Sequence, residues 1–156
     1  MTPGINAACK AGITHTIHEY HHDPASTGYG NEAAEKMGVD PARVFKTLVV
    51  TVDGKSLAVG VVPVTDMLSM KLIAKAAGGK KASMADPQEV QRRTGYVLGG
   101  VSPLGQKNRL MTLIDVSAQD FDTIYVSAGR RGLEIELSPG DLARLTGGRF
   151  APLRQE

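Results

Sequence analysis

Two β-rich runs joined by a tight-turn signal constrain the fold of this chain more than any other feature. Residues 45–52 (FKTLVVTV) and 56–64 (SLAVGVVPV) flank the tripeptide Asp53-Gly54-Lys55. Gly54 tolerates the positive φ that a short connection needs, so the pattern predicts an antiparallel hairpin. The hairpin should supply an antiparallel part of the sheet.

Start and stop signals predict the remaining elements. N-cap residues followed by proline open helical turns at Thr2-Pro3, Asp40-Pro41, Asp86-Pro87 and Ser138-Pro139, and further helices are expected at 32–38 and 70–79. Strands are expected at 13–20, 110–116, 122–128 and 133–137. Because strands and helices alternate while hairpins are interspersed, the predicted fold is α/β (α+β) with a mixed sheet.

Length and composition bound the architecture and the compartment. The 156 residues suffice for one domain, predicted to span 1–156, and a hydrophobic fraction of 42% is ordinary for a globular protein. The net charge of +2 neither requires nor opposes a nucleic-acid partner. The single cysteine, Cys9, fits a reducing compartment, and no apolar run is long enough to span a bilayer. A cytoplasmic location without membrane association is therefore expected.

The histidines of the first strand do not predict a metal site. His15 and His18 should point to opposite faces of the strand, whereas His21, His22 and Asp23 lie in the loop that follows. Metal ligands would need unusual folding back of that loop. A polar strand end is the expected role, with no bound metal.

No side-chain nucleophile is predicted either. Cys9 is expected on the apolar side of the first helix, as a buried structural cysteine. Ser102 and Ser127 lack the G-x-S-x-G turn of a serine hydrolase. Lys46 enters the first strand of the hairpin, where its charge could lie in solvent or bind a phosphate or carbonyl at the mouth of a cleft.

The glycine-rich stretch Tyr96–Arg109 (YVLGGVSPLGQKNR) is the strongest candidate for a ligand loop. Gly99, Gly100 and Gly105 allow turns with positive φ and a close approach of backbone N–H groups, which suits an anion or an oxyanion. A tight connection between two strands is the alternative. Neither a nucleoside-triphosphate P-loop nor a dinucleotide fingerprint is present, so no nucleotide cofactor is expected.

Several segments together resemble a known family. They are MTPGI at the start, HEYHHDP at 18–24, YGNEAAEKMG at 29–38, FKTLVV at 45–50, MADPQEVQRRTGYVLGGVSPLGQK at 84–107 and TIYVSAGRRGLEIEL at 123–137. This pattern is similar to the YbaK/EbsC family of aminoacyl-tRNA deacylases, which includes bacterial Cys-tRNA(Pro) deacylases and is related to the editing domain inserted in bacterial prolyl-tRNA synthetases. The likeness runs from Met1 to about Phe150.

The resemblance implies a fold, a site and a reaction. The fold would be a mixed, twisted, partly barrel-like sheet flanked by helices, with its cleft beside the glycine loop and no metal or cofactor. Lys46 would hold the ester and the terminal ribose-phosphate, and the N–H of Gly99 would stabilise charge on the carbonyl oxygen. The implied substrate-binding positions are Tyr20, Tyr29, Thr47, Gly100, Ser102, Pro103, Ser127 and Glu134.

The implied activity is trans-editing of Cys-tRNA(Pro), and of other cysteinyl-tRNAs, by attack of the substrate's own thiol on its ester. A transient complex with prolyl-tRNA synthetase is also implied, with basic residues such as Lys80, Lys81, Arg92 and Arg93 as candidate tRNA contacts. Two departures from the family pattern bear on specificity: Glu134 replaces the usual Asp, and Ala128 would be strained if its φ were positive. An Ala-tRNA(Pro) deacylase and a non-catalytic tRNA- or synthetase-binding module are the alternatives.

Overall fold

The computed structural model describes residues 1–25 and 29–155, without the side chains of Tyr29 and Gly30. The helices are α1 (Pro3–Ala11), α2 (Tyr29–Met37), α3 (Met70–Ala76), α4 (Pro87–Thr94) and α5 (Pro139–Thr146), with 3-10 turns η1 (Pro41–Arg43) and η2 (Val116–Asp120). The strands are β1 (His15–Glu19), β2 (Phe45–Val52), β3 (Ser56–Pro63), β4 (Ala82–Met84), β5 (Met111–Asp115), β6 (Ile124–Arg130), β7 (Leu133–Leu137) and β8 (Arg149–Ala151).

The predicted hairpin is confirmed as the pair β2 and β3. The two strands are antiparallel with Phe45 opposite Pro63 and Val52 opposite Ser56. Asp53 has φ +53° and Gly54 has φ +66°. Two consecutive positive φ angles make the tight hairpin turn that matches the twist of the strands.

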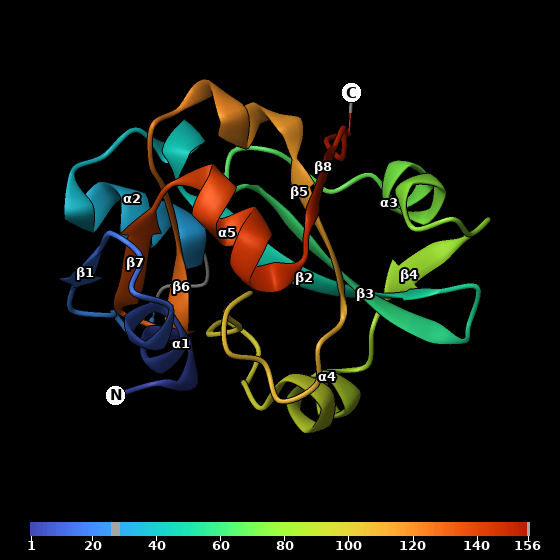
Figure 1. Ribbon diagram of the computed structural model, residues 1–156, viewed down its shortest axis with the longest axis horizontal. Helices are drawn as coiled ribbons and strands as arrows, with labels where there is room; N and C mark the ends of the chain where they lie inside the picture. The colour runs from blue at the N-terminus through green and yellow to red at the C-terminus, as the bar shows by residue number, and fades with distance from the viewer. Residues whose placement is uncertain (26–28, 156) are drawn as a thin grey trace.

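The strands form two sheets (Figure 1). The larger sheet has the order β4-β2-β3-β5-β8, with β5 parallel to both neighbours and the other pairs antiparallel, so the predicted mixed sheet is confirmed. The smaller sheet has the order β1-β7-β6 and is antiparallel. A bridge between Val44 and Tyr125 links them. The sequence analysis did not anticipate the short strands β4 and β8, nor the division into two sheets.

The helices begin where the sequence signals place them. Thr2, Ser69, Asp86 and Ser138 each accept a hydrogen bond from the backbone N–H three residues later. These contacts satisfy donors that the first helical turn leaves unpaired. Helix α2 begins three residues earlier than predicted, and α3 ends at Ala76, just before Gly78-Gly79, which were expected to stop it. Among the described helices, none is long and apolar enough to cross a membrane.

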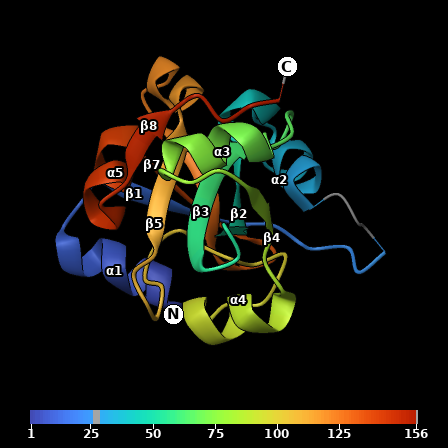
Figure 2. The same cartoon turned by 90° about the vertical axis from the view of Figure 1, so that its right-hand side faces the viewer.

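Alternate side chains along a strand face either the core or the opposite face of the sheet. In the smaller sheet, Leu133, Ile135 and Leu137 of β7 face the main core between the two sheets. Glu134 and Glu136 therefore project from the opposite face, because side chains alternate along a strand. Helix α3 covers the outer face of the larger sheet, where its Ile73 packs in a second core (Figure 2).

Candidate functional site

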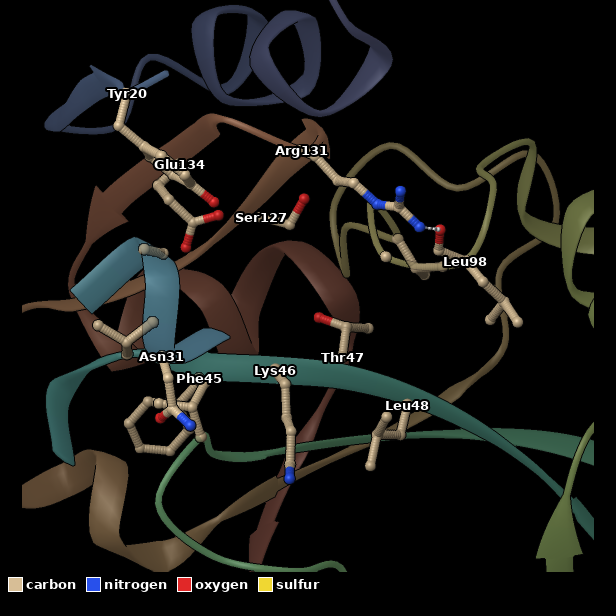
Figure 3. Close-up of a pocket in the computed structure, with 15 residues that line it drawn as sticks. Tyr20, Asn31, Phe45, Lys46, Thr47, Leu48, Leu98, Ser127, Arg131 and Glu134 are labelled. Carbon is tan, nitrogen blue, oxygen red and sulfur yellow. Dashed lines mark hydrogen bonds between the residues drawn. The ribbon is translucent and has the colours of Figure 1, made fainter. Parts of the chain in front are cut away.

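A pocket of about 330 Å³ opens between β2, the β6–β7 hairpin and the loop that follows α4 (Figure 3). Six residues predicted from the sequence line it: Tyr20, Lys46, Thr47, Gly99, Ser127 and Glu134. Apolar side chains from Val44, Phe45, Leu48, Val64, Leu98 and Val101 form much of the remaining wall. Segments distant in the sequence thus meet in one small cavity of mixed polarity.

The smaller sheet brings three of the polar residues together. Ser127 on β6 lies opposite Glu134 on β7, and the strand register places His18 of β1 opposite Glu134 on the other side. Tyr20 follows two residues after His18, on the same face, and its N–H donates to the carbonyl of Gly132 at 2.9 Å. The polar face of this sheet is therefore one wall of the pocket.

Strand β2 forms the facing wall, and its neighbouring residues leave it in different directions. Thr47 points toward Ser127, whereas Lys46 leaves the opposite side of the strand with Nζ directed away from Ser127 and Glu134 (Figure 3). The Oγ1 of Thr47 is buried and has no hydrogen-bond partner among the described residues. A buried hydroxyl without a partner is costly, which makes Thr47 a candidate for bonding a substrate.

Burial perturbs the titratable groups of the pocket. It raises the pKa of Glu134 to about 8, so this carboxyl is largely protonated at neutral pH and can donate a hydrogen bond. Burial, followed by the charge of Glu134, raises the pKa of Tyr20. Burial lowers the pKa of Lys46, and the charge of Asp66 partly offsets this effect.

The glycine loop contributes Leu98 and Gly99 to the pocket. Gly99 has φ +87°, and a methyl group at its Cα would lie 2.4 Å from Nε of Arg131. At Gly100 a methyl group would lie 2.9 Å from the Cα of Arg130. Gly99 is thus required by its positive φ, and Gly100 by close packing of the loop against the backbone at the end of β6.

Three other predicted residues, all described, do not line the pocket. Gly100 and Ser102 are buried beneath it, and the Ser102 Oγ accepts from the N–H of Leu104 at 3.2 Å. Pro103 borders a separate hollow near Arg109. The side chain of Tyr29 lies outside the described residues. Ser102 and Pro103 have the position of residues that support the loop.

Two expectations for single residues are corrected. Cys9 is exposed, not buried, and its Sγ lies 3.8 Å from Nε2 of His15, because Gly4, Ile5 and Ala8 form the inward face of α1. Ala128 does not have a positive φ and carries no backbone strain, because the positive angle at the β-bulge falls on Gly129 at +123°.

The polar side chains near the pocket pair with one another. His18 Nε2 lies 2.9 Å from Glu136, and His22 Nδ1 lies 2.6 Å from Glu32. Burial alone would raise the pKa of Glu32, but hydrogen bonds from His22, the Asp23 N–H and Lys36 hold it at about 2. Within the described part of the chain, no group of three His, Cys, Asp or Glu side chains is placed to bind a metal.

Sequence reasoning missed two polar residues of the pocket. Asn31 lines it from α2, and no local signal marked it. Arg131 lines it from the β6–β7 turn and donates from Nη2 to the carbonyl of Leu98 at 3.2 Å. The quoted block YVSAGRRGL contains Arg131, but only the fold shows that it reaches the glycine loop.

Comparison with known proteins identifies the family. The sequence profile of the aminoacyl-tRNA editing domain matches residues 22–145. This chain belongs to that family. The editing domain is 41% identical over 120 residues to a proposed Cys-tRNA(Pro)/Cys-tRNA(Cys) deacylase, EbsC of Enterococcus faecalis, covering 77% of this chain and 73% of that protein. It is 32% identical over 115 residues to the uncharacterised protein YwhH of Bacillus subtilis, covering 74% and 73%.

A solved structure supports the same conclusion at the level of the fold. A proposed trans-editing enzyme for prolyl-tRNA synthetase superposes with a TM-score of 0.86 at 26% identity, covering 99% of this chain and 96% of that one. The mixed α/β fold and the resemblance to the YbaK/EbsC family are confirmed. The chain is thus an aminoacyl-tRNA editing domain by both sequence and fold.

Proposed function

We propose that this editing domain removes cysteine from mischarged Cys-tRNA(Pro), and from other cysteinyl-tRNAs, with the substrate's own thiol as the nucleophile. The observation that carries the proposal is the composition of the pocket. Its described lining residues carry the hydroxyls of Tyr20, Thr47 and Ser127, but they include no histidine that could act as a base and no cysteine. A small cavity that positions an ester without a protein nucleophile suits a substrate that attacks itself.

The reaction would proceed by exchange of one ester for another. The cysteinyl sulfur bonds to the carbonyl carbon, the bond from that carbon to the ribose oxygen breaks, and the thiol proton ends on the ribose hydroxyl. The product is a cysteine thiolactone, which water then opens to cysteine. An N–H from Gly99 directed at the carbonyl oxygen would stabilise the tetrahedral intermediate. The rate would depend on the thiol, so serine and alanine esters would react slowly even if they fitted the cavity.

The cationic groups of the pocket fit the rest of the substrate. With Nζ outside the Thr47 wall, Lys46 is placed for the ribose-phosphate end, where a compact positive charge binds phosphate well. The neutral acid of Glu134 adds no negative charge that would oppose a tRNA end. This arrangement favours an anionic substrate over a free amino acid.

A basic surface could hold the tRNA body. The N–H of Lys107 donates to the carbonyl of Thr94 at 2.9 Å, and the N–H of Asn108 donates to that of Arg93 at 3.0 Å. These bonds bring the second half of the glycine loop beside the end of α4, where Arg92 and Arg93 lie. A transient partner such as prolyl-tRNA synthetase, in the cytoplasm, would supply the recognition of tRNA(Pro) that a few phosphate contacts cannot.

The test is deacylation of Cys-tRNA(Pro), Ser-tRNA(Pro) and Ala-tRNA(Pro) by the wild type and by Lys46→Ala, with the released product identified by mass. Lys71→Ala, an exposed lysine on α3 outside the pocket, is the matched control. We expect loss of cysteine only, through a thiolactone, slowed at least tenfold by Lys46→Ala and unchanged by Lys71→Ala.

Other outcomes point elsewhere. Equal release of serine or alanine would indicate an activated water, and a preference for alanine would indicate an Ala-tRNA(Pro) deacylase. No release from any ester, with tRNA still bound, would leave a non-catalytic binding module.

A further inference from the structure

The residues around Gly99 form a tight four-residue turn. The N–H of Gly100 donates to the carbonyl of Val97 at 3.0 Å, which closes a four-residue turn with Leu98 and Gly99 at its centre. Gly99 has φ +87°, whereas Leu98 does not have a positive φ. This combination defines a type II turn, in which glycine occupies the third position.

The central peptide is the part of such a turn that can reorient. Types I and II differ mainly by a half-rotation of the unit joining the two central residues, here the Leu98 carbonyl and the Gly99 N–H. Gly99 has no Cβ, so it tolerates both the positive φ of type II and the negative φ of type I. Sequence alone therefore leaves the direction of the Gly99 N–H open.

Arg131 holds that peptide in one orientation. Its Nη2 donates to the Leu98 carbonyl at 3.2 Å, across a separation of 33 residues. The guanidinium lies against Gly99, since an added Cβ there would meet Nε at 2.4 Å and Nη2 at 2.6 Å. In Figure 3 the carbonyl of Leu98 points at Arg131, on the side of the pocket away from β2.

The direction of the donor follows from peptide geometry. The described peptide bonds are trans, so C=O and N–H of one unit point in opposite directions. With the Leu98 carbonyl fixed on Arg131, the Gly99 N–H points away from the guanidinium. A half-rotation would place the carbonyl where the N–H had been, and a carbonyl oxygen there would repel a developing oxyanion.

We propose that Arg131 is a positioning residue that locks the Leu98–Gly99 peptide so that the Gly99 N–H faces the reacting carbonyl. This inference rests on the oxyanion role proposed above for Gly99. Arg131 acts through the peptide and need not touch the ester. The guanidinium is suited to the task because it is a rigid planar group that offers several donors.

Kinetics separate this role from phosphate binding. Arg131→Ala should lower kcat for Cys-tRNA(Pro) by about tenfold to a hundredfold and leave KM within about twofold. The loss is smaller than the roughly 10²–10³-fold seen when an oxyanion donor is removed outright, because the Gly99 N–H is still present. Arg131→Lys, which retains one donor group, should recover part of kcat. Arg130→Ala is the matched control, because Arg130 is exposed and its nearest acid, Glu19, is 3.9 Å away. It should leave both constants within about twofold.

A raised KM with unchanged kcat, together with a weaker dependence on salt, would overturn the proposal and make Arg131 a phosphate contact. Equal losses from Arg130→Ala and Arg131→Ala would also overturn it, because the effect would then be one of general charge.

A measurement that needs no activity tests the lock directly. The carbonyl ¹³C resonance of Leu98 and the amide resonances of Gly99 are recorded for the labelled wild type and Arg131→Ala. Loss of the hydrogen bond should move the Leu98 carbonyl signal and shift or double the Gly99 amide signal, as both orientations become populated. Unchanged signals would overturn the proposal.

The two readouts distinguish two kinds of failure. If the signals change while an active enzyme keeps its kcat, the positioning role is wrong. If no ester is cleaved by the wild type, the proposed function fails, and the resonances alone decide whether Arg131 holds the peptide.

Discussion

Replacing Glu134 by glutamine should change how the stability of the protein depends on pH. The Glu134 side chain is buried, with the residue 7% exposed, and burial raises its pKa from 4.5 to about 8. The folded state therefore keeps a proton that the unfolded state releases. Glutamine has nearly the same shape but cannot ionise, so Glu134→Gln removes this titration and little else.

The sign and size follow from linkage. Between pH 4.5 and about 8 the folded protein binds more protons at this site than the unfolded chain, so the free energy of unfolding falls as pH rises. The full shift corresponds to about 5 kcal/mol, of which about 3 kcal/mol should be lost between pH 5 and pH 8. The Glu134→Gln variant has no carboxyl at this site, so its free energy of unfolding should not fall by this amount. Its stability relative to that of the wild type should therefore increase as pH rises.

The assay is urea denaturation of both proteins at pH 5, 6, 7 and 8. The two proteins differ only at residue 134, so the difference between the two profiles isolates Glu134. A difference that grows by about 3 kcal/mol from pH 5 to pH 8 is expected. Parallel profiles would refute the reasoning, because they would mean that Glu134 is ionised in the folded protein at little cost.

Two further predictions concern the pocket and the surface around it. Thr47→Val removes a buried hydroxyl that has no hydrogen-bond partner in the described part of the chain, so it should raise the free energy of unfolding by about 1 kcal/mol. The same change should slow deacylation at least tenfold, and a lower Tm would contradict this reasoning. The affinity for tRNA should fall as the salt concentration rises. Arg92→Ala should reduce the magnitude of the slope of log affinity against log salt concentration by about 1 relative to the wild type. A binding constant that does not change with salt would exclude a phosphate contact at Arg92.

The elements that could be predicted are those whose causes are local. The β2–β3 hairpin follows from Asp53-Gly54, which adopt the positive φ angles of its turn. The helix starts follow from capping residues such as Ser69 and Asp86, whose side chains bond donors three residues away. In each case the interaction that fixes the element lies within the element's own sequence.

The elements that were missed depend on distant partners. Strand β8 has three residues and forms only because β5 offers an edge. Cys9 was placed on the wrong side of α1, because helical spacing does not reveal which side the rest of the chain covers.

The site was predictable only in part for the same reason. The family resemblance indicated Lys46, Thr47 and Ser127, which do line one pocket. Neighbours of Gly99 in sequence were assigned to the site with it, yet after Gly100 the chain turns into the interior, where Ser102 is fully buried. Arg131 reaches the same loop from 33 residues away. Contacts of that separation leave no periodic trace in the sequence.

The smaller sheet separates the residues needed for folding from those that line the pocket. Along β7, Leu133, Ile135 and Leu137 are committed to the core, while Glu134 between them faces the pocket. A substitution at such an intervening position alters what the cavity accepts and leaves the packed face intact. Substrate preference and foldability are thus carried by alternate residues of one strand. A designer could vary Tyr20, Ser127 and Glu134 together in a library and still expect most members to fold.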